Sequence, residues 1–316
     1  MTKNSSKWIP GHPHWYEDLP KGGASAGVPK LVHDDVNAMN DVYLELSRTS
    51  TLMRGLGLLF SALGFSFLVF ALYMYSGFFP LESDVIIPFI LCSLMMVGFS
   101  WVIIYLARVD LNISQDRPVR FNRISRKVYV YEHNSHWNIF SRYPVSIKVF
   151  DWDTLHAEIH RQAGYSGKAY IQRFSLWLVS CKQGTNEVVD RFELKGNMPT
   201  TAELYNTWAY CQAYMKCGIN EVPQYAPRPQ GISFRRSLFE HIRFLDPTEE
   251  GRKVRSRMSI WDWLVNIPIF VAGFWLFIPS GIGHYIAMRV APEVRWPMEI
   301  DAESRGNRKV GMVADS

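Results

Sequence analysis

The chain has 316 residues, a net charge of +5 and 48% hydrophobic residues. This length holds one soluble domain of ordinary size together with membrane segments and tails. The positive charge is modest and lies beside apolar runs, and no RNA- or DNA-binding motif occurs, so a nucleic-acid partner is excluded and a membrane surface is favoured. Cys211 and Cys217 match no common zinc spacing, and no cofactor is expected.

The first 33 residues contain four prolines and four glycines, which argues against a regular element, so residues 1–33 are predicted to form a flexible tail. Residues 34–50 are predicted to contain a short amphipathic helix, Val36–Arg48. Its N-cap would be Asp34 or Asp35, and its apolar side chains recur at helical spacing.

Two apolar runs without an ionisable side chain follow, Gly55–Tyr75 and Val85–Ala107. At 1.5 Å per residue, each can cross a hydrocarbon core about 30 Å thick. Residues 51–108 are therefore predicted to form a transmembrane helical hairpin. Basic residues flank its outer ends and the connecting loop is only acidic, which predicts a cytoplasmic N-terminus and a cytoplasmic main domain. The alternative is a soluble protein with two buried core helices.

Residues 109–220 have the composition of a folded cytosolic domain. A short helix is predicted at Leu155–Arg161, and a longer one from Thr200 to about Met215, with Thr200 and Glu203 as a capping box and Gly218 as its end. Pro118–Tyr131 is predicted to form a strand, a turn at Asn122–Lys127 and a second strand. Further strands are predicted at Val145–Phe150, Ala169–Cys181 and Glu187–Leu194, of which the last two form a hairpin across Lys182–Asn186.

This order of elements predicts an α+β domain in which a curled antiparallel sheet is capped by the C-terminal helix. The layout resembles that of the pleckstrin-homology-like domains of bacterial membrane proteins. The whole chain is thus predicted to be a membrane protein with an α-helical transmembrane hairpin and one cytosolic α+β domain.

Residues 221–259 are predicted to form a basic linker. A cluster of basic side chains near its end is a candidate for contact with anionic lipid headgroups, worth about 1 kcal/mol per residue. The alternative is charge that sets topology without binding a specific lipid. The cluster consists of Arg252, Lys253, Arg255 and Arg257.

Residues 260–290 form a third apolar segment that prolines and glycines interrupt. Leu264–Ile278 alone would span only about 22 Å, so a tilted, kinked span and a re-entrant or interfacial segment both remain open. Asn266 and His284 are its candidate intramembrane polar residues, and Asp262 is a further one. Asp262 and His284 lie close to ends from which side chains reach water easily. Residues 291–316 are predicted to be a disordered polar tail.

The best candidate metal ligands are His156 and His160, because histidines four apart share a helix face. Glu158 would point away from that face, and no third ligand is identifiable, so a solvated helix face is the favoured alternative. No nucleophile elbow and no nucleotide-binding glycine motif occurs, so a non-enzymatic protein is predicted.

The double span, Pro118–Tyr131, Val149–Asp153 and the late apolar segment together resemble a family of uncharacterised proteobacterial inner-membrane proteins, often found near type VI secretion effector genes. The resemblance extends from about Asp35 to Ala291. It implies a bacterial inner-membrane location and a cytosolic domain that binds an effector or a secretion component, most simply as an immunity protein.

Two alternatives from other functional classes remain. One is a channel or transport component that uses the broken third segment. The other is a membrane-bound metal-dependent hydrolase that uses His156 and His160. The sequence leaves open whether the protein forms a homo-oligomer.

Overall fold

The computed structural model describes residues 6–21, 35–49, 54–78, 86–134, 136–141, 143–165, 170–225, 231–239 and 242–305. Three of its helices are long and apolar enough to cross a membrane: α1 (Leu56–Tyr75), α2 (Ile86–Asn112) and α6 (Ile260–Val290). At most 11% of the most apolar window of each helix is buried inside the protein. Such uncovered apolar surface is unfavourable in water, so these helices suggest a membrane protein. Two core helices wrapped by a soluble domain would instead be buried.

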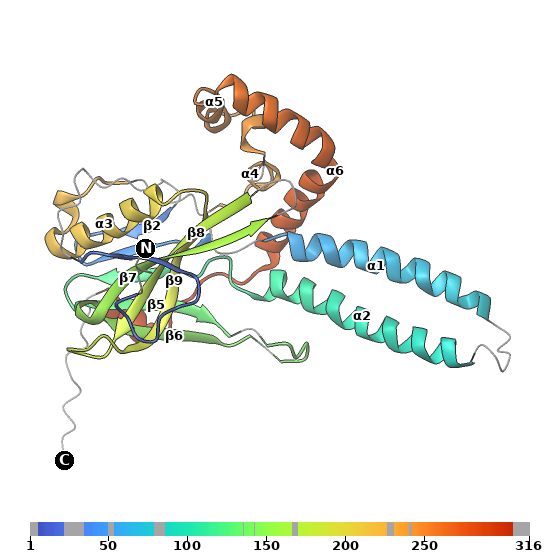
Figure 1. Cartoon of the computed structure of the whole chain (residues 1–316), viewed down its shortest axis with the longest axis horizontal. Helices are drawn as coiled ribbons and strands as arrows, with labels where there is room; N and C mark the ends of the chain where they lie inside the picture. Colours follow the sequence, from blue (N-terminus) through green and yellow to red (C-terminus); the bar gives the residue numbers. More distant parts are fainter. Residues whose placement is uncertain are drawn as a thin grey trace, which may run out of the picture.

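The predicted helical hairpin is present as α1 and α2, which project together from one side of the molecule (Figure 1). Helix α1 begins one residue after Gly55, as expected. Helix α2 continues beyond Ala107 to Asn112, so that its last turns carry charged side chains. The side of the membrane on which its ends lie stays a prediction.

Within the described residues, nine strands form two antiparallel sheets, and neither is curled. The prediction of a single curled sheet is therefore wrong. The chain passes from one sheet to the other through a 3-10 turn at Trp152–Thr154. One sheet has the order β1–β7–β8–β9, with β1 Trp15–Leu19, β7 Leu155–Tyr165, β8 Tyr170–Cys181 and β9 Val188–Met198. The other has the order β2–β3–β4–β5–β6, with β2 Val36–Met39, β3 Tyr43–Leu46, β4 Val119–Asn122, β5 Lys127–His133 and β6 Val145–Asp151.

The predicted helix Val36–Arg48 is instead the β2–β3 hairpin. Asn40 forms the turn, because its side-chain oxygen accepts hydrogen bonds from the backbone N–H groups of Val42 and Tyr43, each at 2.9 Å. Strand β3 then pairs with β4, far along the chain. Apolar residues that fitted a helical period here also fit a twisted hairpin, and the long-range pairing decides between them.

The predicted helix Leu155–Arg161 is also wrong, since these residues belong to β7. Leu155, Ala157 and Ile159 are all fully buried, which is the two-residue period of a strand. Strand β7 pairs with β8 along its whole length, and this ladder outweighs the local helix preference.

The amino-terminal segment is more ordered than the prediction of a flexible tail, at least for residues 6–21. Strand β1 pairs with β7, and Ile9 forms a bridge to Glu187. Residues 22–34 lie outside the described part of the chain.

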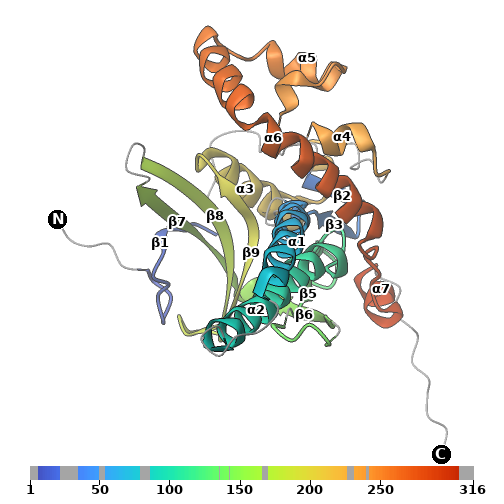
Figure 2. The ribbon, with the colours of Figure 1, turned by 90° about the vertical axis from the view of Figure 1, so that its right-hand side faces the viewer.

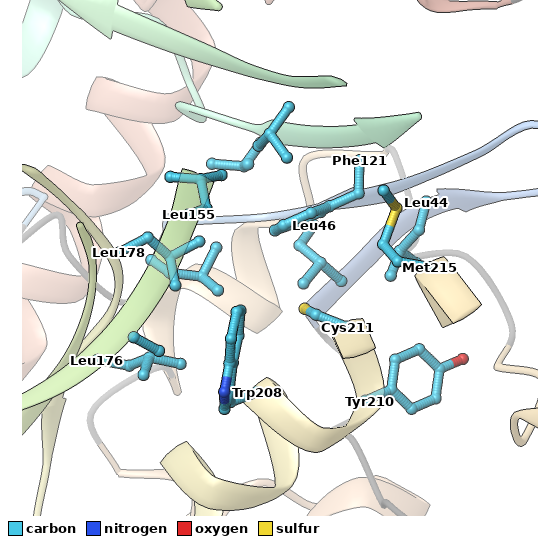
Figure 3. Close-up of a cluster of buried hydrophobic side chains, with 14 of the residues drawn as sticks. Leu44, Leu46, Phe121, Leu155, Leu176, Leu178, Trp208, Tyr210, Cys211 and Met215 are labelled. Atoms are coloured by element: carbon cyan, nitrogen blue, oxygen red, sulfur yellow. The ribbon is translucent and has the colours of Figure 1, made fainter. Parts of the chain in front are cut away.

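Helix α3 (Ala202–Cys217) packs against both sheets and closes the hydrophobic core (Figure 3). Its predicted apolar stripe of Leu204, Trp208, Cys211 and Met215 is buried, which confirms that prediction. Gly218 ends the helix with φ +85°, as expected of a C-terminal glycine. The N-cap is Thr201 rather than Thr200, and no side-chain capping bond forms there, so the predicted capping box is wrong.

The predicted basic linker contains two short helices, α4 (Phe234–Leu238) and α5 (Glu249–Arg255). Helix α6 is continuous through Pro268 and Pro279 and is bent, as expected where a proline removes a backbone hydrogen bond. Figures 1 and 2 both show it running across the α1–α2 pair rather than alongside it. Its carboxyl-terminal part packs against α1 and α4 through close backbone contacts. A Cβ added at Gly281 would lie 2.8 Å from the Leu238 backbone.

The predicted disordered tail is wrong for its first part, because Met298–Ser304 forms helix α7 (Figure 2). Ser304 is fully buried, and its carbonyl oxygen accepts a hydrogen bond of 2.6 Å from the Asn122 side chain. Arg120 binds the Ser304 hydroxyl and the Asp301 carboxylate. Helix α7 is therefore fixed to the β2–β6 sheet.

Substitution of Trp208 should strongly destabilise the core. This side chain is 2% exposed, and its ring lies 5.4 Å from that of Trp152, so Trp208→Ala would leave a large cavity between α3 and the sheets. We expect a loss of about 3–5 kcal/mol in the free energy of unfolding, measured by denaturant titration of the detergent-solubilised protein. Lys216→Ala, at an exposed position of the same helix, should change it by less than about 0.5 kcal/mol.

Candidate functional site

The two predicted metal ligands lie on strand β7 rather than on a helix. On a strand, residues two apart share a face, so His156, Glu158 and His160 all point the same way, and the expectation that Glu158 points away is wrong. Glu158 is fully buried. Its Oε1 lies 2.7 Å from His160 Nε2 and 3.0 Å from Arg191 Nε.

Aromatic rings cover both histidines. Trp8 stacks on His156 at 4.2 Å between ring centroids, and His12 stacks on His160 at 4.1 Å. Trp177 also stacks on His160, with ring centroids 4.9 Å apart. In the part of the chain that the structure describes, no group of three or more His, Cys, Asp or Glu side chains is arranged to hold a metal ion. These contacts therefore hold the amino-terminal segment against the β1–β7–β8–β9 sheet.

The pKa of His12 is lowered from its ordinary value of 6.5, mainly by burial and then by the neighbouring His160. Its Nδ1 also accepts a hydrogen bond of 3.2 Å from the backbone N–H of His14, which requires the unprotonated nitrogen. The docked segment thus favours neutral His12.

The predicted headgroup cluster lies on and just after α5, and its members have different environments. Arg252, Lys253 and Arg257 are exposed. Arg255 is partly buried and donates to the carbonyl oxygens of Phe244 and Asp246, at 2.9 and 2.6 Å. Within the described part of the chain, the side chains of Arg252, Lys253 and Arg257 make no comparable hydrogen bonds. Lipid contact by any of the four stays a prediction.

Two of the predicted intramembrane polar residues are far apart. Asn266 donates a hydrogen bond of 2.7 Å to the carbonyl oxygen of Asp262, one turn earlier in α6. His284 lies 18 residues further on, about 27 Å along a helix, where α6 meets Gly55. The structure therefore does not bring these two side chains together to line one pathway.

A polar junction at the base of α1 and α2 was missed by the sequence analysis. The Asp110 carboxylate accepts hydrogen bonds from the backbone N–H groups of Gly55 at 3.1 Å and Leu58 at 2.8 Å, so it caps the first turn of α1. Arg54 donates to the carbonyl oxygens of Asp110 and Ile113, at 3.1 and 3.0 Å, and thus caps the end of α2. Each helix end supplies the group that the other lacks.

A cavity of about 550 Å³ lies beside this junction, between the β2–β3 hairpin, α4, α6 and the segment before α7. One of the cations that line it is Arg120, whose guanidinium lies 4.6 and 4.5 Å from the ring centroids of Tyr43 and Trp296. Arg120 is also paired with Glu45 at 2.7 Å and Asp301 at 2.8 Å. Arg120 is thus already paired and links the β2–β6 sheet to α7, while Arg236 and Arg305 also line the cavity.

A second hollow, of about 500 Å³, lies between β6 of one sheet and β8–β9 of the other. We call it the β6–β9 groove. Strand β6 is the last strand of its sheet and pairs with β5 alone among the described strands. The groove is lined in part by Lys148, Val149, Phe150, Cys181, Val189 and Asp190. The sequence predicted strand β6 but not that it forms an edge.

Residues 96–308, more than half of the chain, match the model of a family of unknown function, DUF6708. The chain belongs to this family. The matched region begins within α2 and includes β4–β9 and α3–α7, so it contains the groove and α6, whereas α1 and β1–β3 precede it. The β2–β3 side of the cavity therefore lies outside the match. Comparisons with curated proteins and with solved structures gave no match. Nothing in the family match links the chain to type VI secretion.

Removal of the Asp110 carboxylate should loosen the base of the hairpin. Asp110→Ala leaves the N–H groups of Gly55 and Leu58 without their acceptor, and we expect a loss of about 1–2 kcal/mol in the free energy of unfolding. Thermal unfolding of the detergent-solubilised protein measures this loss. Asp110→Asn keeps an acceptor oxygen and should lose clearly less, and equal losses in the two variants would contradict the capping role.

Docking of the amino-terminal segment should weaken in acid. Because the pKa of His12 is lower in the docked state than its ordinary 6.5, the detached segment binds protons more readily, and docking that is complete above pH 6.5 is lost as the pH falls below it. Hydrogen exchange of residues 6–14, corrected for the intrinsic pH dependence, should show lower protection at pH 5.5 than at pH 7.5. His12→Phe keeps a stacking ring and should remove the part of this pH dependence that His12 causes. Burial also lowers the pKa of His156, which lies under Trp8, so a part due to His156 should remain.

Proposed function

We propose that the protein is a membrane-anchored, non-enzymatic binding protein whose cytoplasmic domain holds an extended segment of a protein partner in the β6–β9 groove. The observation that carries this proposal is the edge of β6, which pairs with no second strand among the described residues and lies beside a groove. An exposed strand edge offers backbone N–H and C=O groups to an added strand.

The size and surface of the groove support a peptide ligand. The seven residues of β6 extend for about 23 Å, which suits a partner strand of similar length. Val149 is 44% exposed on β6 and Val189 is 70% exposed on β9. These apolar side chains on the two strands that line the groove give an inserted segment something to pack against, while the edge supplies hydrogen bonds.

An ion pair crosses the groove and would have to adjust when a partner binds. Lys148 Nζ lies 2.6 Å from Asp190 Oδ2, but both side chains are more than a third exposed. Such solvent-screened pairs contribute at most about 1 kcal/mol, so their separation is a small cost for strand addition. Once separated, the two charges can pair with side chains of the partner.

The resemblance described above narrows this proposal. It makes the partner a type VI secretion effector or a component of that machinery, and the protein an inner-membrane immunity or accessory protein. The Val149–Asp153 part of the resemblance includes the end of β6 that lines the groove. This narrower proposal rests on the resemblance alone and is tested separately from partner binding.

Site-specific photo-crosslinking in the native host tests the proposal. Benzoylphenylalanine in place of Val149 or Val189 should give an adduct with one and the same protein. The matched control is Ile124, which is 63% exposed on the β4–β5 turn and should not crosslink to that protein. Val149→Lys should reduce the adduct from position 189 at least tenfold, because it places a charge in the groove.

Absence of a protein adduct at both groove positions, or equal adducts at Ile124, would overturn partner binding at this edge. If the crosslinked protein is an effector or secretion component, and Val149→Lys also abolishes resistance to competing cells, the narrower proposal is supported. A crosslinked protein of another kind removes the narrower proposal and leaves the binding function.

A further inference from the structure

The loop between β5 and β6 exposes large aromatic side chains, which is unfavourable in water. It reaches beyond the sheets, on the side from which α1 and α2 project (Figure 1). We call its described residues, 136–141 and 143, the aromatic loop. Phe140 is 82% exposed and Trp137 is 63% exposed, whereas Ile139 and Tyr143 in the same loop are buried.

The aromatic loop is held against α2 by ring contacts and by one cation. Phe140 lies against Trp101 with ring centroids 5.9 Å apart, and Trp137 lies against Tyr105 at 4.4 Å. Arg108 donates a hydrogen bond of 2.7 Å to the carbonyl oxygen of Ser141. Its guanidinium also lies 5.6 Å from the ring centroid of Tyr143. The loop thus has a defined position along α2.

That position coincides with the end of the membrane-crossing part of α2. The helix has 27 residues, about 40 Å, so it exceeds a hydrocarbon core of about 30 Å by two turns. Its charged residues Arg108 and Asp110 occupy the excess. Trp101 and Tyr105 lie just before them, at the level where tryptophan and tyrosine rings favour the headgroup layer.

From this geometry we infer that the aromatic loop is a second membrane contact, which inserts Trp137 and Phe140 into the phospholipid headgroup layer beside α2. The partner is the bilayer itself. The exposed rings continue the lipid-facing surface of α2, on which Val97 is 69% exposed and Leu94 is 64% exposed. Burial of these rings among lipids removes apolar surface from water, and the aromatic faces tolerate the polar boundary.

This contact has a mechanical consequence. The β5–β6 hairpin links the loop directly to the β2–β6 sheet, so that sheet is attached to the membrane both through α2 and through the loop. Two attachments at different points restrict tilting of the sheets relative to the bilayer, which a single helical hairpin does not. The inference needs α2 to cross the membrane but is independent of the β6–β9 groove.

Photo-crosslinking of the full-length protein in nanodiscs of phosphatidylcholine and phosphatidylglycerol tests this inference. Benzoylphenylalanine is placed at Trp137, Phe140, Val97 or Ile124, and lipid adducts are detected by intact-protein mass spectrometry. We expect lipid adducts at the two loop positions at no less than a third of the yield at Val97. Ile124, exposed on a turn of the sheet, should give less than a tenth of that yield.

Adducts at Val97 without adducts at either loop position would overturn the inference, and so would loop adducts to a second copy of the protein or to another protein. Failure at Val97 as well would overturn it together with the membrane span of α2. A second measurement is independent of crosslinking. Trp137→Phe should remove part of the fluorescence that brominated lipids quench, whereas Trp8→Phe, in the docked amino-terminal segment, should leave the quenched part unchanged.

Discussion

The arrangement of this protein depends on the exchange of groups between Arg54 and Asp110. A helix end that emerges from an apolar run has backbone N–H or C=O groups that must find partners, and here each helix end supplies them to the other. Helix α1 follows from the β2–β3 hairpin, and α2 leads into β4, so this junction fixes the membrane hairpin to the β2–β6 sheet. The positions of α6 and of the cavity beside it follow, because His284 packs against Gly55.

Both ends of the described chain return to the sheets and complete them. The amino-terminal segment adds β1 to the edge of β7, and α7 docks on the other sheet through Arg120, which is 2% exposed and paired with two carboxylates. Removing either acidic partner would leave a buried charge less well compensated, which is costly. Segments before and after residues 109–220 are therefore parts of the two-sheet domain. The limits 109–220, which were predicted from composition, describe only the centre of this domain.

The two proposals assign different partners to different surfaces of the same sheet unit. The β6–β9 groove offers an open strand edge to a protein, while the aromatic loop at the start of β6 offers exposed rings to the bilayer. Strand β6 connects the two features, so a partner strand added at its edge would lie close to the membrane surface. A partner that approaches or crosses the membrane would meet the groove there.

The sequence by itself determined the elements whose pattern is long or complete: the two uncharged runs, the β4–β5 and β8–β9 hairpins, and the buried stripe and terminal glycine of α3. Local signals suffice there because length, turn residues and periodicity agree. Only the tertiary structure decided that Val36–Arg48 and Leu155–Arg161 are strands, since the ladders with β4 and β8 outweigh local preference. It likewise decided the functional features: His156, Glu158 and His160 share a face only on a strand, Asp110 caps a helix that begins 54 residues earlier, and β6 is an edge only because of the strand order. Such relations depend on contacts between distant residues, which no local pattern contains.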